Sequence, residues 1–304
     1  MTTGAPSGMT STRRLLLFCG FVMGHGNHWR CIFPDLENGI ADALGWVSQG
    51  TLIGQREYTT LQVPGGDAGA TASVIAWPTA GLRATFVVVR GQRGERAYLH
   101  SAFPAAGAGC KHKVRIDSVH EVSCGLEARI SGVLGDAAVT FFDPLYCLNR
   151  DRYRPGAIVD VELAGIAYSL RIVPVGTTLQ SAVGDVPMAG AAVLLSARKH
   201  GPEQTSSTIG DEQAFGVAYI QQPDSFPLPD DYQFCAPVND VEESEVDAIP
   251  VWKFRGTVMR VYYGRQNIDI DIYATREGMP DAAVPKPGDE ISGTLWLQGT
   301  LPPR

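Results

Sequence analysis

The sequence predicts a mostly β protein, with two related small Greek-key (OB-like) barrels and an N-terminal α+β portion that has one clear helix. Three observations predict this class. Short runs rich in β-branched and aromatic residues recur about every 8 to 15 residues, separated by Gly and Pro. One segment shows the three- and four-residue apolar spacing of an amphipathic helix. An order of strands and turns in the middle of the chain recurs near its C-terminus.

Composition sets the scale of this architecture. The chain has 304 residues, of which 44 % are hydrophobic, so it can bury a core and is too apolar to be disordered. From shifts in composition we expect four parts, which are listed here in chain order. They are an N-terminal α+β portion at 1–105, a first barrel-like domain at 106–200, an acidic connecting segment at 201–250 and a second barrel-like repeat at 251–304.

The expected helix covers 36–47, where apolar residues recur at helical spacing after Pro34 and Asp35. The expected strands cover 58–63, 71–77, 82–90, 113–119, 126–133, 138–142, 158–163, 168–173, 189–196, 215–220, 251–261, 268–274 and 290–297. Because helices do not alternate with these strands, a sandwich or barrel is favoured over a parallel α/β sheet.

Each copy of the recurring pattern has two strands, a connector, a basic-Pro-Gly turn and a third strand that ends on Gly. Pro155 and Pro287 can fix the backbone angle φ in the turns, and Gly156 and Gly288 can take the positive φ that follows. We therefore expect 126–170 and 252–301 to superpose as the same fold, with the paired turns at equivalent places.

Trp296 lies in the last expected strand. Alternation there puts Ile291, Leu295 and Leu297 on the inner face of the barrel, so the Trp296 side chain points the other way. An indole is rarely left in water. We therefore predict that Trp296 covers a neighbouring domain or contacts a partner.

Four residues of zinc-ligand type fall within 15 positions of one another: Cys110, His112, His120 and Cys124. Their spacing is not a standard one, and a strand at 113–119 would hold the first and third about 30 Å apart. A second set is His25, His28 and Cys31, although a glycine between histidines is more typical of a flexible entry to the first element. We expect no cofactor, and zinc at the first set is the alternative.

Motifs for nucleophilic catalysis and nucleotide binding are absent from the sequence. There is no G-x-S-x-G elbow, and the glycine-rich stretches 64–69 and 89–94 lack the Lys-Ser/Thr pair of a P-loop. Asp143, Asp269 and Asp271 are candidate paired carboxylates, but polar-out alternation on a half-exposed sheet explains them as well. The sequence favours a protein that is not an enzyme, and a metal-dependent enzyme using the Cys/His cluster is the third hypothesis.

Arg and Tyr gather in and around two predicted connections, one in each copy. The residues are Arg150, Arg152, Tyr153, Arg154, Arg255, Arg260, Tyr262, Tyr263 and Arg265. OB-like barrels hold single-stranded nucleic acid with such residues, and protein interfaces use the same types. The net charge is −7, from 25 Lys and Arg against 32 Asp and Glu, so we favour a protein partner and keep single-stranded nucleic acid as the alternative.

Between Lys199 and Lys253 the chain has eleven acidic residues and no Lys or Arg. A solvated linker explains such a run. The alternative is a docking segment for a basic partner surface, with Glu242, Glu243 and Glu245 as partner contacts.

Six sparse, irregularly spaced cysteines are typical of a reducing compartment, so we expect a cytoplasmic protein. Arg13 and Arg14 precede an apolar run, which leaves export as the alternative, and no other window is long enough for a membrane helix. The sequence thus predicts a non-enzymatic binding or assembly protein that holds a protein partner, or self-associates, through its barrel loops.

Overall fold

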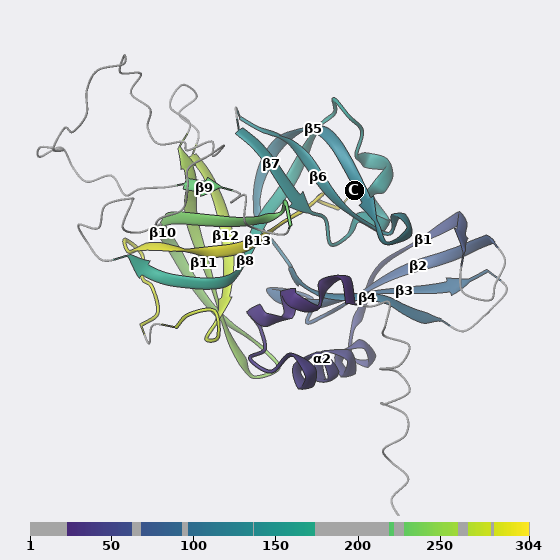
Figure 1. The fold of residues 1–304 in the computed structure, drawn as a ribbon, viewed down its shortest axis with the longest axis horizontal. Helices are drawn as coiled ribbons and strands as arrows, with labels where there is room; N and C mark the ends of the chain where they lie inside the picture. Colours follow the sequence, from purple (N-terminus) through teal and green to yellow (C-terminus); the bar gives the residue numbers. More distant parts are fainter. Residues whose placement is uncertain are drawn as a thin grey trace, which may run out of the picture.

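A computed structural model describes residues 23–62, 68–92, 97–135, 137–173, 219–221, 228–260, 267–280 and 283–303. Strands dominate this part of the chain and helices are few and short, which confirms the mostly β class. The described strands form a four-stranded sheet and a nine-stranded sheet. Figure 1 shows that the larger sheet is curled. No described helix is both long and apolar enough to cross a membrane.

The N-terminal part combines three helical segments with the four-stranded sheet. The helical segments are η2 (Met23–Cys31), α2 (Leu36–Gly45) and η3 (Trp46–Ser48), and the strands, in sheet order, are β1 (Thr51–Gln62), β2 (Ala68–Trp77), β3 (Leu82–Gly91) and β4 (Tyr98–Ala106). Small residues, Ala70, Ala72 and Ala76, alternate along the buried face of β2. The predicted helix is present, as α2 continued by η3.

The rest of the described chain forms the larger sheet and three short helical segments. The strands are β5 (Cys110–Val122), β6 (Glu127–Leu134), β7 (Ala137–Phe142), β8 (Ile158–Val173), β9 (Tyr219–Gln221), β10 (Asp231–Val246), β11 (Ile249–Arg260), β12 (Asn267–Thr275) and β13 (Glu290–Thr300). The helical segments are η4 (Ser123–Gly125), α3 (Tyr146–Asn149) and η5 (Arg150–Arg152). The two strands predicted at 158–163 and 168–173 are one continuous strand, β8. The predicted strand at 189–196 lies outside the described residues, as does most of the one at 215–220.

Strand pairing closes the larger sheet into two rings. In barrel 1, β5 pairs with β6, β6 with β7, β7 with β13, β13 with β8, and β8 with β5. In barrel 2, β10 pairs with β11, β11 with β12, β12 with β8, β8 with β13, and β13 with β10. Both rings therefore contain β8 and β13. Five-stranded closure is compatible with an OB-like barrel, and the Greek-key detail stays a prediction.

The two Pro-Gly turns occupy matching places in the two rings. The backbone N–H of Ile116 donates to the carbonyl of Ala157 at 2.8 Å, and that of Gly156 donates to the carbonyl of Ile116 at 2.7 Å. Barrel 2 has the same pair of bonds. The backbone N–H of Val238 donates to the carbonyl of Asp289 at 2.8 Å, and that of Gly288 donates to the carbonyl of Val238 at 2.9 Å. Gly156 and Gly288 have φ of 83° and 95°, as the turn geometry predicts. The predicted internal repeat requires such a match.

Two described strands lie where the sequence shows no strand pattern. β10 takes up 231–246 of the predicted acidic connecting segment, and β4 is rich in small residues. Pro237 and the acidic residues lower the β propensity of β10, but its backbone pairs with β11 and β13 on its two edges. Because β8 and β13 belong to both barrels, the rings do not divide at 200 or 250 as the four predicted parts do.

The two hydrophobic cores lie on opposite sides of β13. Ile291, Leu295 and Leu297 belong to the core inside the barrels, and Trp296 belongs to the core shared with the N-terminal part. Trp296 is 0 % exposed, so in this structure it covers a neighbouring part of its own chain and is closed to an outside partner. Alternation along one strand decides this division.

Candidate functional site

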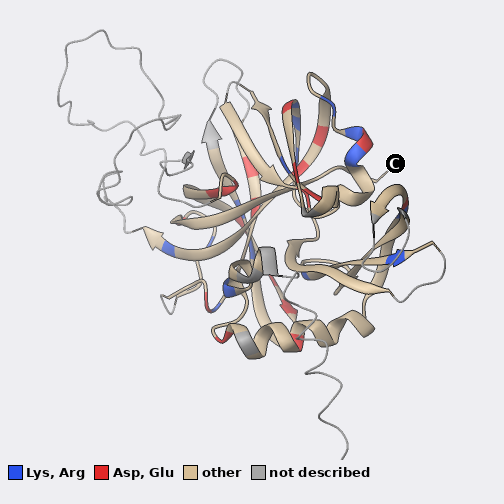
Figure 2. Cartoon of the chain, turned by 45° about the vertical axis from the view of Figure 1, so that its right-hand side comes forward, with Lys and Arg blue, Asp and Glu red and all other residues tan. Residues whose placement is uncertain are grey.

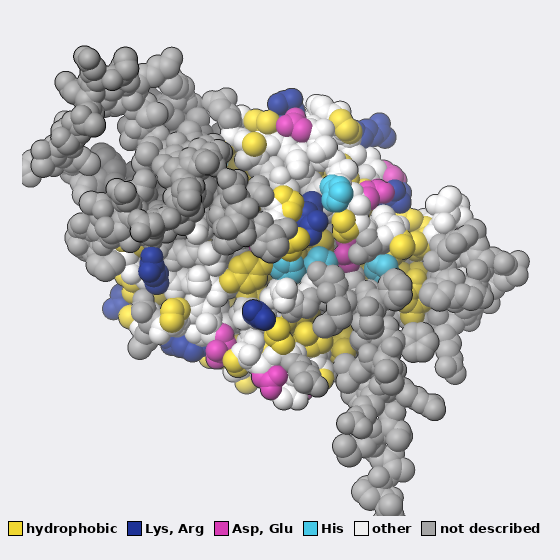
Figure 3. Space-filling view, viewed as in Figure 1, with side chains coloured by type: hydrophobic (Ala, Val, Ile, Leu, Met, Phe, Trp, Pro, Cys, Tyr) yellow, Lys and Arg dark blue, Asp and Glu magenta, His cyan; other side chains and the backbone are white. Residues whose placement is uncertain are grey.

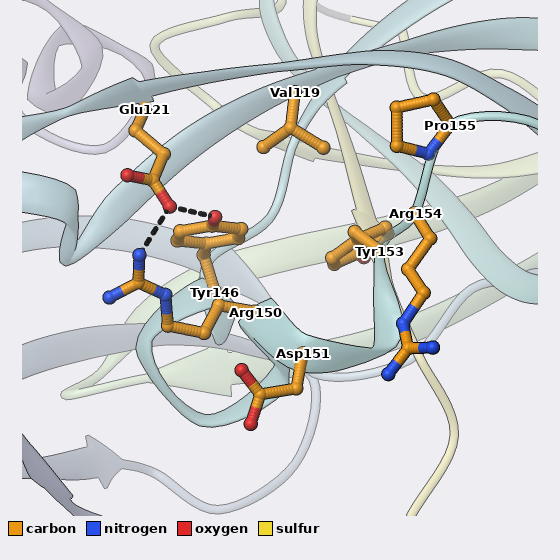
Figure 4. A pocket seen from close by; sticks show the side chains of 8 residues that line it. All are labelled: Val119, Glu121, Tyr146, Arg150, Asp151, Tyr153, Arg154 and Pro155. Atoms are coloured by element: carbon orange, nitrogen blue, oxygen red, sulfur yellow. Dashed lines mark hydrogen bonds and ion pairs between the residues drawn. The ribbon is translucent and has the colours of Figure 1, made fainter.

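A pocket of about 570 Å³ opens on barrel 1 between β5 and the β7–β8 connection (Figure 4). Its walls are Val119, Glu121, Tyr146, Arg150, Asp151, Tyr153, Arg154 and Pro155. All but two of these residues come from the connection, which contains α3 and η5 and ends at the Pro155-Gly156 turn. Beyond Ile116, β5 continues past the start of β8, and this leaves the space that the pocket occupies.

Glu121 connects the two walls of the pocket. Its carboxylate accepts a hydrogen bond from the Tyr146 hydroxyl at 2.5 Å and forms an ion pair with Arg150 at 2.7 Å. The Arg150 guanidinium also lies over the ring of Tyr58 in β1, 5.5 Å from its centroid. Burial raises the pKa of the Tyr146 hydroxyl and the bond to Glu121 raises it further, so this hydroxyl stays a donor at neutral pH.

Asp143 holds the connection from behind. Its buried carboxylate accepts hydrogen bonds from the Tyr153 hydroxyl at 2.8 Å, the Leu145 backbone N–H at 2.7 Å and the Asn149 amide at 3.3 Å. Burial raises the pKa of Asp143 to about 6, while these hydrogen bonds to its charged form oppose the rise. These contacts give Asp143 a structural role beneath the pocket.

The rim carries the groups that solvent reaches. Arg154 and Pro155 are exposed and Val119 is half-buried, whereas Tyr146 and Tyr153 are only 3 % and 5 % exposed. Within the described part of the chain, the Arg154 side chain has no hydrogen bond or ion pair, and only its backbone carbonyl is engaged, by the N–H of Ala157 at 3.0 Å. Its guanidinium extends from the connection without contact to the other labelled side chains (Figure 4).

Three of the predicted contact residues of the first copy, Arg150, Tyr153 and Arg154, therefore line one pocket. Arg152 instead donates to the carbonyl of Pro302 at 2.9 Å, which fastens the C-terminal end of the chain. Figure 2 shows basic and acidic residues side by side at this turn, close to the C-terminus. The sequence did not single out Glu121, because it is far from the connection along the chain.

No family model, curated protein or solved structure matches this chain.

The second predicted Arg/Tyr group is only partly described. Arg255 forms an ion pair with the buried Asp271, with 3.0 Å between its Nε and the carboxylate. The same carboxylate accepts a contact from the Cys110 thiol at 3.6 Å. Tyr262, Tyr263 and Arg265 lie outside the described residues. The backbone of Arg260 is described as the end of β11, but its side chain is not described.

The predicted zinc ligands are spread along β5. Cys110 and His112 lie at its start, where His112 donates through Nε2 to the carbonyl of Asp269 at 2.6 Å. His120 lies near its end and Cys124 is exposed in η4. Among the described residues, no group of three or more His, Cys, Asp or Glu is arranged to hold a metal ion.

His25 and His28 belong to a buried polar cluster at the junction of the N-terminal part with both barrels. His25 pairs with Glu127 of β6 at 2.9 Å, and His28 Nδ1 contacts the Tyr168 hydroxyl of β8. Tyr168 donates in turn to Asp231 of β10 at 2.9 Å. With its hydroxyl proton used there, Tyr168 accepts from His28, so the neutral imidazole carries its proton on Nδ1.

Burial controls the ionisation of this cluster. It lowers the pKa of His28 to about 3, with His25 and Arg129 adding to the effect. Burial also raises the pKa of Asp231 to about 6, helped by Asp230 and opposed by the bond from Tyr168. Its contacts join η2 to β6 and β8, and β8 to β10, so we assign it to holding the parts of the molecule together.

The predicted acidic contacts lie on the β10–β11 hairpin, whose outer part we call the acidic arm (residues 239–253). Glu242, Glu243 and Glu245 are exposed, and Glu242 forms an ion pair with Lys253 across the hairpin. The tip is fixed to the N-terminal part, where the Trp46 indole N–H donates to Asp247 at 2.8 Å. The arm is therefore an ordered hairpin with an acidic surface.

Proposed function

We propose that this chain is a non-enzymatic binding protein that holds a protein partner in the pocket of barrel 1. One observation carries the proposal: the β7–β8 connection gathers Arg150, Tyr153 and Arg154 around one open pocket with apolar rim residues, Val119 and Pro155. Arg and Tyr are enriched among the residues that dominate protein interfaces. The cytoplasm remains the proposed compartment.

The pocket is held in shape before anything binds. Glu121 and Asp143 each fix two or more groups of the connection with hydrogen bonds or ion pairs. A rigid site loses little conformational entropy on binding, so more of the contact energy appears as affinity. This rigidity supports a binding role for the loop.

Single-stranded nucleic acid is the second candidate, favoured by the near-parallel rings of Tyr146 and Tyr153, 6.1 Å apart with 26° between planes. Two observations weigh against it. Both rings are at least 95 % buried, so neither offers an open face on which a base could stack. Glu121 and Asp151 in the same pocket are paired with Arg150 and Arg56, so among the described lining residues Arg154 is the single unpaired cation, which is too few to follow a phosphate backbone. On the described surface in Figure 3, charged side chains form small mixed groups.

The experiment places a photo-crosslinking residue at position 154 in cells. Its matched control is position 286, because Lys286 is the exposed basic residue before the equivalent turn of barrel 2. We expect a discrete protein adduct at 154 and none at 286. Adducts of equal strength at both positions, or none at 154, would overturn the proposal.

A titration with a single-stranded oligonucleotide tests the second candidate. If the pocket holds a protein partner, the parent chain should not bind the oligonucleotide at low or moderate salt. Binding that weakens steeply with salt and is lost in Arg154→Glu would instead favour the nucleic-acid function.

A further inference from the structure

The pocket and the acidic arm lie at opposite ends of the molecule. Figure 1 shows α3, beside the pocket, at the upper side of barrel 1, and the hairpin of β10 and β11 reaching down beside α2. The bond from Trp46 to Asp247 fixes the arm in that position. The arm of one copy therefore cannot reach its own pocket, but it is presented to a neighbouring molecule.

We infer that the acidic arm of one copy docks in the barrel 1 pocket of the next, so that the chain associates head to tail with itself. This inference rests on the proposed function, since it names the partner that the pocket holds. The partner is a second copy of this chain.

Charge complementarity supports the match. The arm carries Asp240, Glu242, Glu243 and Glu245 as exposed acidic side chains, against Lys253. The pocket's rim offers the Arg154 guanidinium, which pairs with no other described residue. A guanidinium binds a carboxylate with two parallel hydrogen bonds, so it suits a glutamate better than a lone ammonium would.

The strand geometry of the arm decides which glutamates are available. Side chains alternate along β10, so Glu243 and Glu245 share one face, and Glu242 lies on the other face opposite Lys253. Glu242 is therefore already neutralised by an ion pair. Glu243 and Glu245 make no ion pair within the described residues, so we assign the contact to them.

Two different surfaces make this interface, so each copy can use both at once. Such a heterologous contact produces rings or open filaments, in contrast to the closed dimer of a self-complementary patch. Because the contact depends on exposed charges, added salt weakens it.

The experiment is sedimentation velocity on the full chain and two variants at low and high salt. We expect the parent to form species larger than a dimer at low salt and smaller species at high salt. Glu243→Lys with Glu245→Lys removes the arm's contact, and Arg154→Glu removes the pocket's contact, so each variant alone stays monomeric. An equimolar mixture forms a heterodimer and nothing larger, because one intact arm meets one intact pocket.

Glu242→Gln is the control in the arm, and its assembly should match that of the parent. Thermal unfolding checks that the exposed substitutions leave the fold intact. A parent that stays monomeric up to about 100 µM, the concentration range of weak surface complexes, overturns the inference, as does a mixture that remains monomeric. If the crosslinker at 154 then captures a different protein, the proposed function stands and only this inference falls.

Discussion

The imidazole of His28 lies flat against the indole of Trp296, with 3.8 Å between ring centroids and 8° between planes. His28 comes from η2 and Trp296 from β13, one of the two strands that both barrels share. Trp296 also donates its indole N–H to Asp230 at 2.7 Å, and Asp230 pairs with Arg129 at 2.9 Å. This stacked pair is therefore one of the contacts that connect the N-terminal part to the barrels.

Trp296→Ala should destabilise the protein by about 3 to 5 kcal/mol, the usual cost of removing a buried aromatic side chain. Trp296→Phe keeps most of the apolar area but removes the N–H donor to Asp230, so it should cost about 1 to 3 kcal/mol. Urea unfolding measures both, with the exposed Leu52→Ala as a control. Equal, small effects for all three variants would show that this junction contributes little.

His28→Asn should change the pH dependence of stability. The pKa of His28 is lowered in the folded chain to about 3, so the unfolded chain binds the extra proton below about 6.5. His28 therefore makes the protein less stable as the pH falls from 6.5 towards 3. The variant lacks this effect, and its stability relative to the parent should rise by up to about 1.4 kcal/mol per pH unit of acidification. Denaturant titrations at pH 7, 5.5 and 4.5 give the slopes, and parallel slopes would contradict the assignment.

Asp143→Asn should show the opposite sign. The folded-state pKa of Asp143 is raised to about 6, so this group favours the folded chain at low pH and loses that effect as the pH rises from about 4 to 6. The variant should therefore gain stability relative to the parent over this window. Paired thermal melts at pH 4.5 and 7 test the change. A relative stability that falls with rising pH would contradict it.

Gly156→Ala and Gly288→Ala should each destabilise the protein by about 1 kcal/mol. A Cβ meets no atom within 4 Å at either position, so the cost comes from the positive φ alone and should be similar for the two turns. Gly45→Ala is the control, since its site is equally open but its φ is −63°, and it should stabilise by a few tenths to about 1 kcal/mol. A large difference between the two turns, measured by urea unfolding, would contradict their equivalence.

Gln298→Met should destabilise by about 2 kcal/mol or more, although methionine fills much the same volume. The Gln298 amide accepts a hydrogen bond from the Ala106 backbone N–H and donates one to the Pro104 carbonyl, both at 3.0 Å. It therefore provides partners for two backbone groups at the outer edge of β4. Methionine leaves both buried groups unpaired. Gln55→Met at an exposed position of β1 is the matched control, and equal unfolding midpoints for the two variants would refute this role.

Local pattern in the sequence determined the β class, the single amphipathic helix, the paired Pro-Gly turns and the outward direction of Trp296. These follow from residue spacing and from the φ angles that Pro and Gly allow, which need no distant partner. The cluster of Arg150, Tyr153 and Arg154 was also predictable, because its members are neighbours in one connection.

Only the tertiary structure decided how the strands close into rings, what fills the place beside Trp296 and which residues complete the pocket. β8 and β13 serve both barrels, and Glu121 reaches Arg150 from another strand. The pairing that makes β10 a strand likewise comes from β11 and β13. Hydrogen bonds between strands form between residues far apart along the chain, and local composition does not specify which residues these are.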